Sequence, residues 1–231
     1  MKNKNIFIII GAILLIIIIV VACNIPEKVK DKNKEKLLGI NYNISGNETT
    51  LNDYDTENPV VAMYIKNYGS IVIELYPDIA PNTVNNFISL VKSGFYDNNS
   101  FHRLVPDFVL QGGDPKGDGT GGPGYSIKGE FSNNGFENNL KHEKGIVSMA
   151  RSNDNDSAGS QFFIMLGTST YLDGDYATFG KVIAGMDIID KIAKNEKVSD
   201  DATGKLVHNL TIKKALIDLK GKTYPEVEKI S

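Results

Sequence analysis

The region from Pro59 to Leu219 consists of short apolar runs separated by glycine-rich turns. Runs of this length that contain many branched and aromatic residues are typical of β-strands. A chain with many short strands and few helices favours a closed antiparallel barrel. The expected strands lie at 60–65, 70–76, 101–110, 145–149, 161–166, 178–183 and 206–219.

Only two stretches have the spacing of an amphipathic helix. In the first, Asn82 or Thr83 can cap a helix that ends near Ser93. The second is expected from Met186 to about Asn195. The residues expected to face the core are Val84, Phe87, Ile88 and Val91 in the first helix and Ile188, Ile189 and Ile192 in the second. These helices would cap a mainly β domain of about 160 residues.

The N-terminus has the pattern of an export signal. Lys2 and Lys4 precede an apolar run from Ile6 to Ala22, and Cys23, the only cysteine, follows. A cysteine at this boundary resembles the lipobox of bacterial lipoproteins, in which the thiol is lipidated after cleavage. The alternative is a retained transmembrane anchor, because the run approaches the roughly 17–25 residues that span a bilayer. Either segment would place the rest of the chain at the extracytoplasmic face of the cell membrane.

The chain therefore divides into four expected segments. Residues 1–22 form a lipoprotein signal peptide, 23–58 the lipidated cysteine and a flexible polar linker, 59–219 the folded domain, and 220–231 a short C-terminal tail. The linker lacks the apolar surface that offsets chain entropy. Without residues 1–22 the chain loses two lysines and no acid, so its net charge changes from −3 to −5. This charge argues against nucleic acid as a partner.

Short patterns elsewhere give no support for a cofactor, a metal or a covalent nucleophile. Gly117–Gly122 match the letters of a dinucleotide-binding loop, but the Pro-Gly pair that follows begins no helix. His102, His142 and His208 lack the spacing of metal ligands. The chain contains no Gly-x-Ser-x-Gly elbow. No cofactor is therefore expected.

Arg103 is unusual because it lies within an apolar run. A buried guanidinium is costly without partners, so such an arginine either reaches solvent or serves chemistry. In one extended strand Arg103 and Gln111 would share a face, although Pro106 can break the register.

Six motifs, in order and at family-like spacing, resemble the cyclophilin-type peptidyl-prolyl isomerases. They are Phe101–Arg103, Gln111–Pro115, Gly121–Tyr125, Gly145–Ala150, Ser160–Ile164, and Tyr171–Gly174 followed by Thr178–Val182. The resemblance covers roughly Ala62 to Leu219. It implies the family fold, a closed eight-stranded antiparallel barrel capped by two α-helices, with a substrate groove on the outer face.

The resemblance also implies roles for individual residues. The catalytic set would be Arg103, Gln111 and Phe108, in which Gln111 orients the arginine and Phe108 is also a wall of the proline pocket. The other residues expected to bind the substrate are His102, Val109, Ala150, Arg151, Gln161, Phe163, Tyr171, Leu172 and Tyr176.

Four of these positions depart from the usual family pattern. Val109 stands where methionine is usual, Arg151 where asparagine is usual, and Tyr176 where histidine is common. The last two resemble many bacterial members. Tyr171 stands where tryptophan is common, which implies weak rather than tight binding of cyclosporin.

The predicted function is isomerisation of X–Pro bonds in proline-containing segments of unfolded or partly folded exported proteins. Rotation about this bond moves no proton and requires no cofactor or metal. The membrane would be a second partner, through the lipid anchor. Two other functions stay open from the sequence. One is a module that binds proline-containing peptides with little turnover, and the other is a structural envelope protein.

Overall fold

A computed structural model describes residues 47–51 and 53–230 of the chain. The expected signal peptide or anchor, Cys23 and the first part of the expected linker lie outside the described residues. Within the described part, no helix is both long and apolar enough to cross a membrane.

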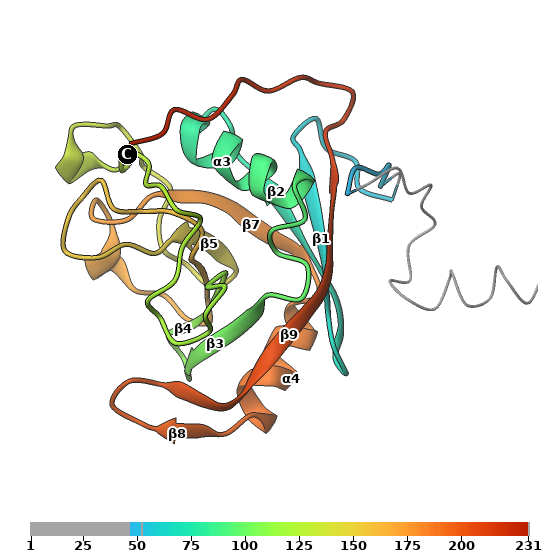
Figure 1. Ribbon diagram of the computed structural model, residues 1–231, viewed down its shortest axis with the longest axis vertical. Coiled ribbons are helices and arrows are strands. Elements are labelled where there is room, and N and C mark those ends of the chain that lie inside the picture. Colours follow the sequence, from blue (N-terminus) through green and yellow to red (C-terminus); the bar gives the residue numbers. More distant parts are fainter. Residues whose placement is uncertain (1–46, 52, 231) are drawn as a thin grey trace, which may run out of the picture. The chain divides into compact units, whose positions relative to one another are not determined.

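The strands form one antiparallel sheet that closes into a barrel (Figure 1). The sheet has the order β1-β2-β7-β5-β6-β4-β3-β9-β8, and β1 also pairs with β9. Eight strands therefore close on themselves, while β8 lies outside the ring and pairs only with β9 among the described strands. This confirms the expected eight-stranded barrel. The strands are Val60–Ile65 (β1), Gly69–Leu75 (β2), Ser100–Val105 (β3), Val109–Gly112 (β4), Ile146–Met149 (β5), Phe162–Met165 (β6), Thr178–Ala184 (β7), Val198–Asp200 (β8) and Lys205–Asp218 (β9).

The two expected helices are α3, Pro81–Lys92, and α4, Met186–Asn195. Both turn their apolar side to the core, and Phe87 of α3 packs against Tyr96, Phe162 and Phe179. Two short 3₁₀ turns also occur, at Ser132–Asn134 and Thr170–Leu172.

The start of α3 differs from the expected cap. Neither Asn82 nor Thr83 caps the helix with its side chain, because Pro81 already lies in the first turn. Instead Glu130, from a distant loop, accepts hydrogen bonds from the backbone N–H of Asn82 at 3.0 Å and of Thr83 at 2.7 Å. A carboxylate suits this place, because the first N–H groups of a helix lack internal partners and carry partial positive charge. The sequence pattern could not show a cap that comes from 47 residues away.

The expected single strand at 101–110 is in fact a hairpin. β3 ends at Val105 and β4 begins at Val109. Pro106 has no N–H to donate to a ladder, and Asp107 adopts φ 58°, so the chain turns here. Arg103 and Gln111, expected on one strand, therefore face each other across two paired strands.

The end of the expected flexible linker is packed on the barrel. Thr49 N–H donates to the Ile217 carbonyl of β9 at 2.7 Å, and the side chain of Leu51 is only 1% exposed. Asp218 accepts from Leu51 N–H at 2.8 Å, and Lys220 Nζ donates to the Leu51 carbonyl at 3.0 Å. We call residues 47–51 the N-terminal clasp. The clasp pairs with the part of the β9 edge that β3 leaves unpaired. The polar composition of the linker gave no sign of this pairing.

The expected C-terminal tail is also packed. Residues 219–230, which we call the C-terminal strap, leave β9 and cross α3 toward the loop around Ser126 (Figure 1). Tyr224 and Val227 of the strap pack against the main core.

Candidate active site

Arg103 is half-buried on the outer side of the barrel, at the paired centre of β3 and β4. Its Nε donates to the Thr203 carbonyl at 2.8 Å, and one terminal nitrogen, Nη1, donates to Gln111 Oε1 at 3.2 Å. Burial lowers the pKa of Arg103, but an arginine titrates so far above neutral pH that it stays charged. The guanidinium is thus a charged donor held from two sides.

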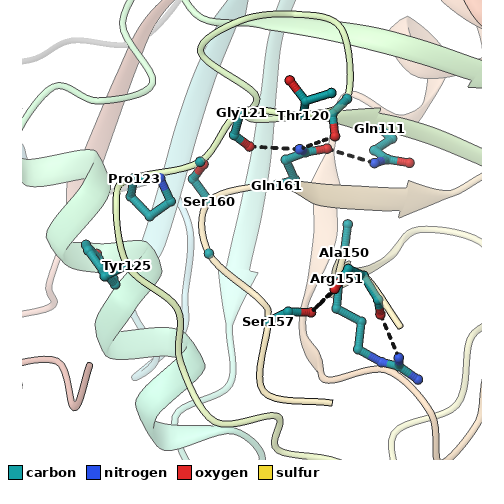
Figure 2. Close-up of a pocket in the computed structure, with 14 residues that line it drawn as sticks. Gln111, Thr120, Gly121, Pro123, Tyr125, Ala150, Arg151, Ser157, Ser160 and Gln161 are labelled. Carbon is teal, nitrogen blue, oxygen red and sulfur yellow. Dashed lines mark hydrogen bonds between the residues drawn. The ribbon is translucent and has the colours of Figure 1, made fainter. Parts of the chain in front are cut away.

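A chain of amide groups orients Gln111 in turn. Gln111 Nε2 donates to Gln161 Oε1 at 3.0 Å. Gln161 Nε2 donates to the carbonyls of Gly119 at 3.0 Å and Gly121 at 2.9 Å. Figure 2 shows Gln161 between Gly121 and Gln111. Because each amide offers one acceptor and one donor end, this chain leaves the Gln111 oxygen facing Arg103.

Arg103 lies at a pocket of about 190 Å³. The pocket combines an apolar wall with the charged donor, and its lining is mainly aromatic and aliphatic. The lining residues are Arg103, Phe108, Val109, Gln111, Ala150, Arg151, Phe163, Leu172 and Tyr176. All were expected at the groove, so the fold brings this part of the expected site together from β3, β4 and β6, the segment after β5, and the segment that leads into β7.

The wall at Phe163 is supported by residues that sequence reasoning did not assign to the site. The His142 ring stacks on Phe163 with centroids 5.9 Å apart. One ring nitrogen of His142 lies 3.0 Å from Asp173 Oδ1 and the other 3.1 Å from Ser148 Oγ. Burial lowers the pKa of His142, although its hydrogen bond to Asp173 opposes this. In the sequence, the one indication of this support was that Ser148 and Asp173, the two partners of His142, fall inside two of the family motifs.

A second pocket of about 350 Å³ adjoins the first and shares Gln111, Ala150 and Arg151 with it (Figure 2). The two pockets form one groove. Arg151 lies at their junction, where its guanidinium is 4.8 Å from the Tyr176 ring centroid and its Nε donates to the Asp175 carbonyl at 2.9 Å. Gln161 lines this second pocket.

Two expected groove residues lie elsewhere. Tyr171 is 69% exposed and stacks on Phe108 at 6.0 Å, so it stands at the outer rim. His102 is only 5% exposed and lines neither pocket. The strand register shifts between Phe101 and Arg103, which places His102 at an irregularity in β3, and its Nδ1 has no hydrogen-bond partner among the described residues.

The fold is a closed eight-stranded antiparallel barrel with two helices, and on its outer side a fixed arginine faces a mainly apolar pocket. A model of the family described as "Cyclophilin type peptidyl-prolyl cis-trans isomerase/CLD" matches residues 60–217. The chain belongs to this family, and it is by class a peptidyl-prolyl cis-trans isomerase.

Individual relatives agree with this assignment. The chain is 46% identical over 134 residues to peptidyl-prolyl cis-trans isomerase-like 1 of Gibberella zeae, covering 58% of this chain and 81% of that protein. It is 45% identical over 130 residues to peptidyl-prolyl cis-trans isomerase B of Bacillus subtilis, covering 56% and 87%. A crystal structure of a cyclophilin type isomerase of Cryptosporidium parvum, determined in the presence of the dipeptide Ala-Pro, matches with a TM-score of 0.61 and 33% identity, covering 68% of this chain and 98% of that one.

Proposed function

We propose that the protein is a membrane-tethered folding catalyst that isomerises X–Pro bonds in exported proteins, with Arg103 as its catalytic residue. The observation that carries the proposal is the position of Arg103, a charged donor fixed by Thr203 and Gln111 at the mouth of an apolar pocket. The Cryptosporidium relative determined with Ala-Pro supports a proline-containing peptide as the ligand.

The energetic demand of this reaction is moderate. Amide resonance holds the X–Pro bond planar, and uncatalysed exchange takes roughly 10–100 s at 25 °C. An acceleration of about 10⁵-fold requires about 7 kcal/mol of binding that is stronger in the twisted transition state than in the substrate.

The pocket supplies the first part of this difference. Phe108, Phe163 and Leu172 offer apolar surface to the proline ring, so the ring is held while the preceding residue rotates. A free peptide loses orientational freedom when it reaches the transition state. A substrate whose proline ring is already fixed in the pocket has lost that freedom on binding, so the barrier is lower.

Arg103 supplies the second part. As the amide twists, the nitrogen lone pair is no longer shared with the carbonyl and becomes an acceptor. Nε and Nη1 of Arg103 are already engaged, while among the described residues no group accepts from Nη2. This leaves charged N–H donors for the substrate. A pre-oriented charge in a partly dry groove contributes several kcal/mol to transition-state stabilisation. The contribution is largest when the lone pair is localised on the nitrogen, which happens in the twisted transition state.

The tether rests on the N-terminal sequence. A basic start, an apolar run and Cys23 at its end support cleavage and lipidation at that cysteine, and thus an extracytoplasmic, membrane-bound enzyme. Proline-containing segments of newly exported proteins are then the natural substrates.

A protease-coupled isomerisation assay on residues 24–231 tests the catalytic part. Wild-type protein should accelerate exchange, and Arg103→Ala should lower kcat/KM by about a hundredfold or more. Equal rates for the two proteins would refute the role of Arg103. Peptide binding that survives Arg103→Ala, together with an inactive wild type, would instead indicate a binding module.

A further inference from the structure

The C-terminal strap lies wholly beyond residues 60–217, the region matched by the family, yet it contacts the loop whose Tyr125 lines the second pocket. Along its course it is fixed to α3. The side-chain amide of Asn82 donates to the Glu228 carbonyl and accepts from the Glu228 N–H, both at 2.9 Å. This pair of bonds copies the pattern of a strand pair, so the backbone at Glu228 has a defined position.

The end of the strap then pairs with the loop that carries Tyr125. Ile230 and Ser126 exchange two backbone hydrogen bonds, at 3.1 Å and 2.8 Å. Between these contacts, Lys229 Nζ lies 4.3 Å from the centroid of the Tyr125 ring. An ammonium group at this distance attracts the face of an aromatic ring.

Tyr125 connects the strap to the wall of the second pocket. Its hydroxyl donates to Asn86 Oδ1 at 2.7 Å, and Asn86 Nδ2 donates to the Gly159 carbonyl at 2.7 Å. Gly159 in turn packs closely on Pro123, because a Cβ at Gly159 would lie only 2.7 Å from Pro123 Cδ. Tyr125, Gly159 and Pro123 all line the second pocket, and Figure 2 shows Pro123 and Tyr125 on the same side of it.

We propose that the C-terminal strap determines substrate specificity by holding the Tyr125 wall of the second pocket, which accepts an acidic side chain near the proline. The chemistry of the ligand follows from the lining. Arg151 is the only charged side chain among the described residues that line this pocket, and its guanidinium donates to backbone carbonyls, with no carboxylate partner among those residues. A substrate carboxylate would therefore meet a positive charge that no acidic side chain neutralises. This inference rests on the proposed function, since it assumes that a proline-containing peptide occupies the groove.

The test compares peptides that differ only beside the proline. Each of the two residues before the proline is made Glu, Leu or Lys in turn, with Ala peptides as reference. Affinity is measured by fluorescence anisotropy and kcat/KM by the coupled assay. Wild-type protein should prefer Glu at one of the two positions, and Lys229→Ala should lower the Glu-to-Leu ratio about threefold, because the wall loses one cation–π contact.

Three further variants separate specificity from general stability. Lys229→Arg keeps the cation over Tyr125 and should retain the wild-type ratio. Lys222→Ala is the matched control, because Lys222 lies in the same strap but contacts Glu57, at 3.8 Å, instead of the pocket wall. Its ratio should not change. Deletion of residues 226–231 should reduce the ratio at least as much as Lys229→Ala.

An unchanged ratio in both Lys229→Ala and the deletion variant would overturn the role of the strap. A wild type without preference for Glu would overturn the role of the second pocket. Failure of the proposed function is distinguishable, because it appears as a loss of turnover on the Ala peptides, while the affinity ratios still report on the strap.

Discussion

Arg103 and Gln111 occupy directly paired positions of β3 and β4, and Arg103 Nη1 donates to Gln111 Oε1 across 3.2 Å. The turn at Pro106 and Asp107 brings them together, although eight positions separate them in the chain. Gln111 is held by Gln161, which is held by the glycine-rich loop. The orientation of the Arg103 guanidinium therefore depends on hydrogen bonds that run from Gln111 through Gln161 to the glycine-rich loop.

Gln111→Leu should lower kcat/KM about tenfold while leaving the fold intact. The variant removes the acceptor of Nη1, and a hydrogen bond to a charged group is worth about 1.5–3 kcal/mol. The loss should appear mainly in kcat, since the apolar pocket remains. Gln111→Glu, which keeps an acceptor for Arg103, serves as control and should lose less. The positioning role is wrong if Gln111→Leu matches wild type in the coupled assay.

Phe163→Ala should weaken peptide binding, because it removes the ring that forms one wall of the pocket at Arg103, in which we propose that the proline ring binds. Loss of the apolar contact of a large side chain is worth about 1.5–3 kcal/mol, so affinity should fall about tenfold or more. Titration of an Ala-Pro peptide with fluorescence detection measures the effect. Tyr171→Ala is the comparison, since Tyr171 is exposed at the rim, and its affinity should change by less than about threefold. Equal losses in both variants would contradict the assignment of Phe163.

Stability should decrease as pH falls below about 6.5, the usual pKa of histidine. Burial lowers the pKa of His142 and of His102 in the folded state. The unfolded chain then binds more protons than the native state below pH 6.5, so the free energy of unfolding falls until the native histidines also titrate. Above pH 6.5 this contribution is fully present.

Urea unfolding at several pH values measures this dependence. His142→Asn should reduce the slope of the unfolding free energy against pH between about 5 and 6.5. The same substitution at His208, which is exposed, is the control for the effect of replacing any histidine by asparagine. A slope that does not respond to His142→Asn would exclude this histidine as a source.

Leu51→Ala should reduce the free energy of unfolding by about 2–4 kcal/mol, because it leaves a cavity at a fully buried site of the N-terminal clasp. Activity of the folded fraction should not change, since the clasp contacts β9 at Ile217 and Asp218, whereas Arg103 pairs with Lys205 at the other end of that strand. Glu57→Ala removes a carboxylate that is 94% exposed and should change stability by less than about 0.5 kcal/mol. Stability equal to wild type in Leu51→Ala would show that the clasp contributes nothing to the fold.

Cys23→Ser should release the protein from membranes or leave its precursor unprocessed, because only the thiol can carry the lipid. Cell fractionation with immunoblotting measures both size and location. Membrane retention at full precursor length in wild type and variant alike would contradict lipidation and indicate a transmembrane anchor.

Much of the fold followed from local patterns. Short apolar runs rich in branched and aromatic residues placed most strands, and the apolar stripe with Phe87 placed α3 within a residue or two. The motif residues Arg103, Gln111 and Phe163 identified the family, and the structure places all three at one pocket. These features were accessible because each depends on residues close together in the chain or on a motif of fixed spacing.

Contacts between distant segments decided the rest. The hairpin at Pro106 turned an expected neighbour on the same strand into a cross-strand partner of Arg103. Glu130 caps α3, His142 supports Phe163, and Lys229 contacts Tyr125, and each joins segments at least 21 residues apart. The sequence predicted a flexible linker before the barrel and a short tail after it. In the structure, Asp218 at the end of β9 binds the N-terminal clasp, and Asn82 of α3 binds the C-terminal strap. A sequence pattern carries no record of such groups, because they become neighbours only when the barrel closes.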